Sequence, residues 1–327
     1  MRNFFSSHWK VILALILVIL LAVLTVGDGS ASAAQDLSQR LRGHVRAIAS
    51  EEHNTSRPEQ LEQAARYIEL ALAAEGYRVQ RQEYRAGGQT VRNLEVSISN
   101  VANGARPERI FILGAHYDSA PGAPGANDNG SGTAAVLELA RMLKTMQPSP
   151  GTEVKFVFFV NEEPPWFMGA DMGSMRHAER LRREGHKVEG ALILETIGWY
   201  SNQPGSQRLP PELEGRYPTT GNFIAFVGTL ESSALVRDAL AAFRAGSDFP
   251  AHGLAAPNHI MGVTLSDHSS YNRHGYPALM ITDTAFLRYP YYHTAEDTPD
   301  KLDYDSMARV VTGLAKTMTA LASGVRG

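Results

Sequence analysis

The chain has 327 residues, of which 43% are hydrophobic and 20% charged, so it can form one large α/β domain with ample core. Its formal net charge of −3, with no basic tract interleaved with aromatic residues, gives no reason to expect a nucleic-acid partner. Cysteine is absent, which excludes disulfides, thiolate metal ligands and a cysteine nucleophile. Any metal ion must therefore be held by His, Asp and Glu.

The amino terminus has the three parts of an export signal. Arg2 and Lys10 lie in a basic start, and residues 11–26 form an apolar run. Small residues follow, with an A-x-A pattern at 31–33. This order is typical of a secretory signal that is removed by cleavage.

Cleavage after Ala33 would release the rest of the chain outside the cytoplasm. The alternative is a retained anchor, although sixteen apolar residues span about 24 Å, less than the ~30 Å hydrocarbon core of a bilayer. We therefore assign residues 1–34 to a signal peptide or signal anchor and residues 35–327 to an exported domain. A membrane contact is expected only through this N-terminal segment.

Beyond it, apolar residues follow the spacing of helices and strands. Two stretches with helical spacing come first. They are followed by two runs in which apolar and polar residues alternate, at 77–84 and 91–99, and these runs predict an antiparallel strand pair. Short, continuous apolar runs then alternate with helical stretches, as expected of buried strands, at about 110–113, 154–160, 191–194, 223–227 and 278–281. The helical stretches are at about 36–50, 57–75, 133–146, 170–183, 231–244 and 304–322. This pattern predicts a single α/β domain with a mixed, mostly parallel central sheet flanked by helices on both faces.

Two segments, residues 201–220 and 249–264, show neither periodicity. The first is rich in Pro and Gly, and the second has scattered His, Pro and Asn residues. Long ordered loops in such a fold are usually functional. We expect both segments to form walls of a pocket.

A glycine-rich loop follows the predicted strand at 110–113 and carries His116, Asp118 and Asp128. Ligands in open α/β sheets bind at the carboxyl ends of strands, where this loop lies. Imidazole and carboxylate ligands suit zinc or a neighbouring transition metal. Taken alone, the loop is equally consistent with an ordinary Gly/Pro-rich turn that carries a solvated aspartate.

Later strand ends supply matching side chains. Glu162 and Glu163 follow the strand at 154–160, Glu195 ends the next strand, and His293 lies downstream of the last. Two adjacent glutamates after a buried strand are costly to hold together without a nearby cation. As an isolated pair they would indicate a solvated acidic turn. Four strand ends in series predict a metal site at the carboxyl edge of the sheet.

Six short strings carry a resemblance to a known family. GAHYDS, PGANDNGSG, NEEPP, LETIG, SDHSSY and YYHTAEDT resemble, in order, the motifs of the secreted zinc-dependent aminopeptidases. These di-zinc metallopeptidases are related to glutaminyl cyclases and glutamate carboxypeptidase. The resemblance covers about residues 90–325.

The resemblance implies a role for each matching residue. One zinc would be bound by His116 and Glu195 and the other by Glu163 and His293, with Asp128 bridging the two ions. Glu162 would be the general base that holds the metal-bound water. A cis peptide is implied between Asp128 and Asn129.

The same chemistry follows from the residue types. Two divalent ions about 3.5–4 Å apart can share a water, lower its pKa toward about 7 and polarise a carbonyl oxygen. Adjacent side chains after a strand point in different directions, so Glu163 can face a metal ion while Glu162 faces the water. Glu162 would take the proton of the attacking water and return it to the leaving amine. Without a cysteine or a G-x-S-x-G motif, direct attack by water is the expected route.

Four further residues are candidates for supporting roles. Asp118 would accept a hydrogen bond from the His116 imidazole and fix its tautomer, and Asp267 would act similarly near the site. The alternative for Asp267 is a turn or cap residue. Trp166 and Tyr200 could line a substrate side-chain pocket, or they could simply pack against the strand ends.

We therefore predict a zinc-dependent metallo-exopeptidase that removes amino-terminal residues from peptides, exported to the periplasm or outside the cell, or anchored in the membrane. Two zinc ions per chain are expected. Glu195 occupies a position that is aspartate in many relatives, which leaves a mononuclear enzyme open.

Three alternatives have distinct signatures. A mono-zinc glutaminyl cyclase-like acyltransferase needs one metal and a closed pocket, and a carboxypeptidase-type relative needs an arginine near the site. A non-catalytic binding module would have lost a ligand or the base, and here none is missing from the sequence.

Overall fold

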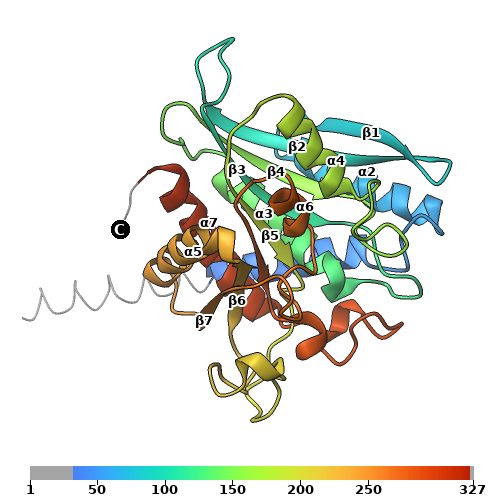
Figure 1. Ribbon diagram of the computed structural model, residues 1–327. Coiled ribbons are helices and arrows are strands. Elements are labelled where there is room, and N and C mark those ends of the chain that lie inside the picture. The colour runs from blue at the N-terminus through green and yellow to red at the C-terminus, as the bar shows by residue number, and fades with distance from the viewer. Residues whose placement is uncertain (1–31, 325–327) are drawn as a thin grey trace, which may run out of the picture.

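Eight strands form one sheet in the order β1-β2-β4-β3-β5-β8-β6-β7 within residues 32–324, the part of the chain that this computed structural model describes (Figure 1). The central strands β4, β3, β5 and β8 are parallel, as are β6 and β7, whereas the pairs β1–β2, β2–β4 and β6–β8 are antiparallel. The predicted mixed, mostly parallel sheet is confirmed. The strands are β1 (Gln80–Ala86), β2 (Gln89–Asn100), β3 (Arg109–His116), β4 (Thr152–Phe159), β5 (Val188–Glu195), β6 (Ile224–Thr229), β7 (Ala251–Ala256) and β8 (Ala278–Thr282).

Helices cover both faces of the sheet, which explains why its central strands are apolar throughout (Figure 1). In β3, Phe111 and Leu113 join the larger core, whereas Ile110 and Ile112 point to the other face. The larger core is formed with the helix at residues 32–48 and with α2, α3, α5 and α7, and α4 and α6 cover the opposite face. The helices are α2 (Pro58–Ala74), α3 (Gly132–Leu143), α4 (Gly173–Arg183), α5 (Ser233–Gly246), α6 (His268–Arg273) and α7 (Tyr304–Ala322).

Two loops, which include the 3₁₀ turn Pro211–Leu213 but no α-helix, cover one face of the sheet at β6 and β8. Leu213, from the predicted loop at 201–220, and Ile260 and Val263, from the second loop, pack against Val227 of β6 and Met280 of β8 in a separate small core. A sheet face covered only by loops leaves room for a pocket. Both loops line that pocket, as the sequence predicted.

Two elements differ from the sequence expectation. Strand β7 lies inside residues 249–264, where neither strand nor helix was expected, so that part of the prediction is wrong. Its sequence AHGLAA has no β-branched residue, and β7 pairs only with β6 at the sheet edge. Helix α6 has six residues, too few to show a helical period in the sequence.

The predicted signal segment falls on residues 1–34, of which 1–31 lie outside the described residues. Across residues 32–324, no helix combines the length and the apolarity that crossing a membrane requires.

The strand ends bring the candidate residues to one edge. His116 and Glu195 are the last residues of the parallel neighbours β3 and β5, and Glu162 and Glu163 follow β4 by three and four residues. Asp128 lies in the short π-helical segment Ala126–Ser131 between β3 and α3 and contacts His116, the last residue of β3. Parallel strands with a common register therefore deliver side chains from distant parts of the chain to one place.

Candidate metal centre

The other four predicted metal ligands lie around Asp128. His116 Nε2 lies 3.3 Å from Asp128 Oδ1 and 3.3 Å from Glu195 Oε2. On the other side, His293 Nε2 lies 2.9 Å from Asp128 Oδ2 and 3.3 Å from Glu163 Oε1. Asp128 thus has one oxygen beside each imidazole.

The donor atoms fit divalent metal ions. Two groups of three residues, His116 with Asp128 and Glu163, and His116 with Glu162 and Glu195, each place their ligand atoms within 4.8 Å of one another. Among the described residues, His116 Nε2 and Glu163 Oε1 are buried atoms with no hydrogen-bond partner. Such atoms cost about 1–3 kcal/mol each unless something binds them. Nitrogen and oxygen donors in this number suit zinc.

Burial and mutual repulsion act on the carboxylates. Burial, reinforced by the charge of Asp128, raises the pKa of Glu163 to about 7 and that of Glu195 to about 8. Burial also raises the pKa of Glu162. For Asp128, burial is outweighed by His116 and His293, which hold its pKa well below the usual range. A site of this kind favours a bound cation or bound protons.

Asp118 holds the turn that carries the two glutamates. Its carboxylate accepts hydrogen bonds from the main-chain N–H groups of Glu162 at 3.1 Å and Glu163 at 3.2 Å. The His116 Nδ1 atom lies 3.0 Å from the main-chain oxygen of Asp118 but 3.6 Å from its carboxylate. In this structure the contact from Asp118 to His116 is made by the carbonyl oxygen, because the carboxylate is engaged with the glutamate turn. The supporting role of the Asp118 carboxylate stays a prediction.

Asp297 holds Asp128 in place. Its two carboxylate oxygens accept from the N–H groups of Asn127 at 2.8 Å and Asp128 at 3.1 Å, and the Tyr289 hydroxyl donates to it at 2.8 Å. The Asp128–Asn129 peptide is cis, as the resemblance implied. The sequence analysis gave Asp297 no role, although it lies four residues after His293 in the quoted string YYHTAEDT.

A serine supports Glu195. The Ser266 hydroxyl donates a hydrogen bond of 2.7 Å to Glu195 Oε2. The neighbouring Asp267, for which a supporting role was predicted, is fully buried, and burial raises its pKa to about 7. Its role stays a prediction, whereas Ser266 was missed.

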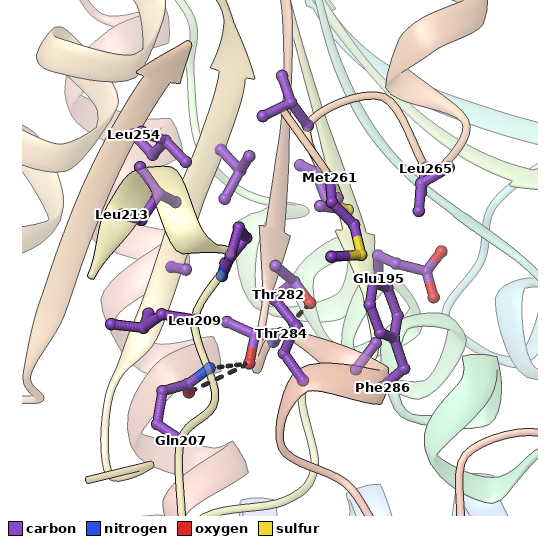
Figure 2. A pocket seen from close by; sticks show the side chains of 18 of the residues that line it. Glu195, Gln207, Leu209, Leu213, Leu254, Met261, Leu265, Thr282, Thr284 and Phe286 are labelled. Atoms are coloured by element: carbon purple, nitrogen blue, oxygen red, sulfur yellow. Dashed lines mark hydrogen bonds between the residues drawn. The ribbon is translucent and has the colours of Figure 1, made fainter. Parts of the chain in front are cut away.

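An apolar pocket of about 100 Å³ opens beside Asp128, Glu162 and Glu195. Figure 2 shows Glu195 close to Met261, Leu265 and Phe286, with Leu209, Leu213 and Leu254 at the opposite end. The floor is the loop-covered face of the sheet, including Ala225, Val227 and Met280. Among the described residues that line the pocket, none is an Arg or a Lys.

The model of peptidase family M28 matches residues 97–318, which is more than half of the chain. The chain belongs to peptidase family M28. The predicted family resemblance is thereby confirmed.

Two curated relatives illustrate the breadth of the M28 match. "Uncharacterized protein YfbL" of Escherichia coli (strain K12) is 39% identical over 287 residues, covering 84% of this chain and 86% of that protein. A "Probable leucine aminopeptidase" of Arthroderma otae is 27% identical over 233 residues, covering 67% of this chain but 55% of that protein. The chain thus spans about half the length of the named aminopeptidase.

Solved structures share the M28 fold. An aminopeptidase from Aneurinibacillus sp. strain AM-1 superposes with a TM-score of 0.64 at 18% identity, covering 88% of this chain and 94% of that one. A glutaminyl cyclase from Fimbriiglobus ruber gives a TM-score of 0.63 at 21% identity, covering 86% and 94%. At these identities the likeness shows the fold, and it does not separate peptide hydrolysis from cyclisation.

Two aromatic candidates lie away from the pocket of this M28 chain. Trp166 donates from Nε1 to Thr55 Oγ1 at 2.9 Å, and the Tyr200 hydroxyl donates to the Ile197 carbonyl at 2.9 Å. Neither is among the residues that line the pocket. Tyr292, which sequence analysis missed, does line it, next to the predicted ligand His293. Adjacency to a predicted ligand was the available signal.

Proposed function

We propose that this protein is a zinc-dependent aminopeptidase that hydrolyses amino-terminal residues from peptides, with Glu162 as the general base. One observation carries the proposal: two imidazoles and three carboxylates lie around Asp128 at the mouth of an apolar pocket that contains no cationic side chain among its described residues. Membership of the M28 family supports a peptide substrate.

We assign two zinc ions to the site, one held by His116 and Glu195 and the other by Glu163 and His293, with Asp128 between them. Bound zinc would polarise the scissile carbonyl and lower the pKa of the attacking water. Ser266 and Asp297 would keep Glu195 and Asp128 oriented, as hydrogen-bond partners of metal ligands do.

Glu162 is suited to proton transfer because Asp118 fixes its main chain and burial raises the pKa of its carboxyl group. It would take a proton from the water at its carboxylate and deliver it to the leaving amine. The nearby Tyr292 hydroxyl would donate a hydrogen bond to the carbonyl oxygen as negative charge develops there.

The lining of the pocket favours an aminopeptidase over the alternatives. A carboxypeptidase needs a cation for the free carboxylate of its substrate, and the described lining supplies none. A glutaminyl cyclase must hold a glutamine amide, but Gln207 and Thr284 already hydrogen-bond each other at 2.9 Å, and the other walls are largely aliphatic. The pocket therefore suits an uncharged, apolar amino-terminal side chain.

We also propose that residues 1–34 direct export and that residues 35–327 form the metallopeptidase domain. The support is the basic, apolar and small-residue order of the N-terminal sequence. Mass spectrometry of the protein recovered from its native host would give a mature chain beginning after Ala33. An intact N terminus in the membrane fraction would indicate a retained anchor instead.

The activity test uses a panel of aminoacyl nitroanilides and short peptides. We expect hydrolysis of the first peptide or amide bond in substrates with a free amino terminus. Activity should be lost with a chelator and recovered with zinc, and elemental analysis should give about two zinc ions per chain. N-acetylated peptides should be resistant. Activity that is indifferent to chelation, or formation of pyroglutamyl peptides from amino-terminal glutamine with one zinc bound, would overturn the proposal.

A further inference from the structure

Asp283 is a buried carboxylate directly after β8 that joins three segments of the site. Its side chain is fully buried. Oδ2 accepts hydrogen bonds from Asn127 Nδ2 and from the main-chain N–H of Trp199, both at 2.9 Å. Oδ1 accepts from the N–H of Ala285, also at 2.9 Å. The carboxylate therefore holds three donors that are far apart in the sequence.

One branch of these contacts leads to the predicted metal ligands. Asn127 is the residue before Asp128, and its side-chain oxygen accepts from Gly198 N–H at 2.8 Å while its amide nitrogen binds Asp283. The Asn127 side chain is thus hydrogen-bonded through both its nitrogen and its oxygen. These two bonds fix the peptide that leads into Asp128. Gly198 lies three residues after the predicted ligand Glu195, so the same contacts also hold the segment that follows Glu195 against Asn127.

The other branch leads to the pocket wall. Thr284 and Ala285 line the pocket and have φ angles of 80° and 46°. Residues with a side chain adopt such angles only when their surroundings hold them there. The Asp283–Ala285 hydrogen bond and a second bond of 2.9 Å from Thr284 N–H to Thr282 Oγ1 supply that restraint. Figure 2 shows Thr282, Thr284 and Phe286 along this wall of the pocket.

We propose that Asp283 is a positioning residue that links the Thr284–Ala285 wall of the pocket to Asp128 through Asn127. The inference rests on the proposed function, since it assigns both ends of the link to one site. A substrate side chain that contacts this wall is then held in a fixed relation to the predicted metal bridge. Both the affinity for zinc and the discrimination among apolar side chains depend on this one carboxylate.

The test is Asp283→Asn, which keeps the shape of the side chain. An amide has one acceptor oxygen, so either Ala285 N–H or the Asn127 and Trp199 donors would face an NH₂ group. We expect zinc affinity, measured by competition with a chromophoric chelator, to fall about 10–100-fold. We also expect the ratio of kcat/KM for leucyl over alanyl substrates to fall.

Glu138→Gln is the matched control. Glu138 is also a fully buried carboxylate with three donors, Arg40 and His44 on Oε1 and Arg141 on Oε2, but it lies in α3 away from the pocket. The Glu138→Gln variant should have a lower melting temperature, while its zinc affinity and its leucyl-to-alanyl ratio of kcat/KM stay as in the wild type. A purely structural role for Asp283 would make the two variants alike.

Asn127→Ala separates the two branches and serves if Asp283→Asn does not fold. It cuts the link to Asp128 but leaves the Asp283–Ala285 bond, so zinc affinity should fall while the substrate ratio is kept. Wild-type zinc affinity in a folded Asp283→Asn or Asn127→Ala protein overturns the inference. Because zinc affinity is read without turnover, an inactive wild type would count against the proposed function alone.

Discussion

Tyr292 lies flat against His293, with ring centroids 3.9 Å apart and planes inclined by 15°. The stack places the phenol among the carboxylates of the site. Burial, with the charges of Asp128, Glu195 and Glu163, raises the Tyr292 pKa far above its usual value. The hydroxyl therefore keeps its proton, and it lines the pocket where a scissile carbonyl would enter.

Replacing Tyr292 with Phe should preserve the stack and remove the donor. We expect kcat to fall by about 10²–10³, as for loss of one oxyanion donor. Zinc content and KM should change little, because the ring still packs on His293. Steady-state kinetics with elemental analysis would check this. A variant with wild-type kcat, or one that loses zinc, would contradict a donor role.

Replacing Glu162 with Gln should separate a base from a ligand. The Glu162 carboxylate approaches His116 Nε2 at 3.9 Å and forms a potential metal-binding group with His116 and Glu195, so its position allows either role. As a general base, its loss should lower kcat by about 10²–10⁴ while both zinc ions remain. Glu163→Gln is the companion variant, expected to lose zinc. Equal zinc loss in both variants would make Glu162 a ligand.

Removing zinc should make stability depend on pH in a defined direction. In the metal-free protein, Glu163 has a pKa of about 7 and Glu195 of about 8, chiefly through burial. Burial lowers the pKa of His293, but its hydrogen bonds with Asp128 and Glu163 outweigh burial and raise it to about 10. All three folded-state values exceed the unfolded ones, about 4.3 for Glu and 6.5 for His. The folded metal-free protein therefore binds more protons than the unfolded chain.

Stability of the metal-free protein should then fall as pH rises from about 5 to 9. Zinc needs deprotonated ligands, so the stabilisation it gives should grow across the same range. Melting temperatures between pH 5.5 and 8.5, with chelator and with zinc, would measure both trends. Glu138→Gln, far from the metal ligands, should shift both curves without changing their divergence. If the melting temperatures of the wild type with chelator and with zinc changed with pH in parallel, Glu163, Glu195 and His293 would not bind protons and zinc in competition.

The predicted ligands His116, Glu163 and Glu195 stand out in the sequence because each follows an apolar run. In β3, the residues from Ile110 to Leu113 alternate between two buried cores, so the strand reads as continuously apolar and His116 marks its end. Glu195 marks the end of β5 in the same way. Because parallel strands end at the same edge of a sheet, such residues can be predicted to lie together without knowledge of the tertiary contacts.

The supporting residues could not be found that way, because their roles depend on contacts between distant segments. Asp297 holds the loop of Asp128, 169 positions earlier, and Asp283 binds Asn127, 156 positions earlier. The pocket is likewise closed by two loops without periodicity. Trp166 and Tyr200 were chosen for their nearness to strand ends in sequence, which does not fix where a side chain points.

Filling the pocket should change which amino-terminal residues are accepted. Val227 lies on β6, is only 8% exposed and forms part of the pocket floor. Val227→Phe would occupy space that a leucyl or phenylalanyl side chain needs but an alanyl side chain does not. We expect kcat/KM for the large apolar substrates to fall about 10–200-fold relative to alanyl substrates. Leu230→Phe, at an exposed position just beyond the same strand, is the control and should keep the wild-type order. An unchanged order in Val227→Phe would mean that the amino-terminal side chain binds outside this pocket.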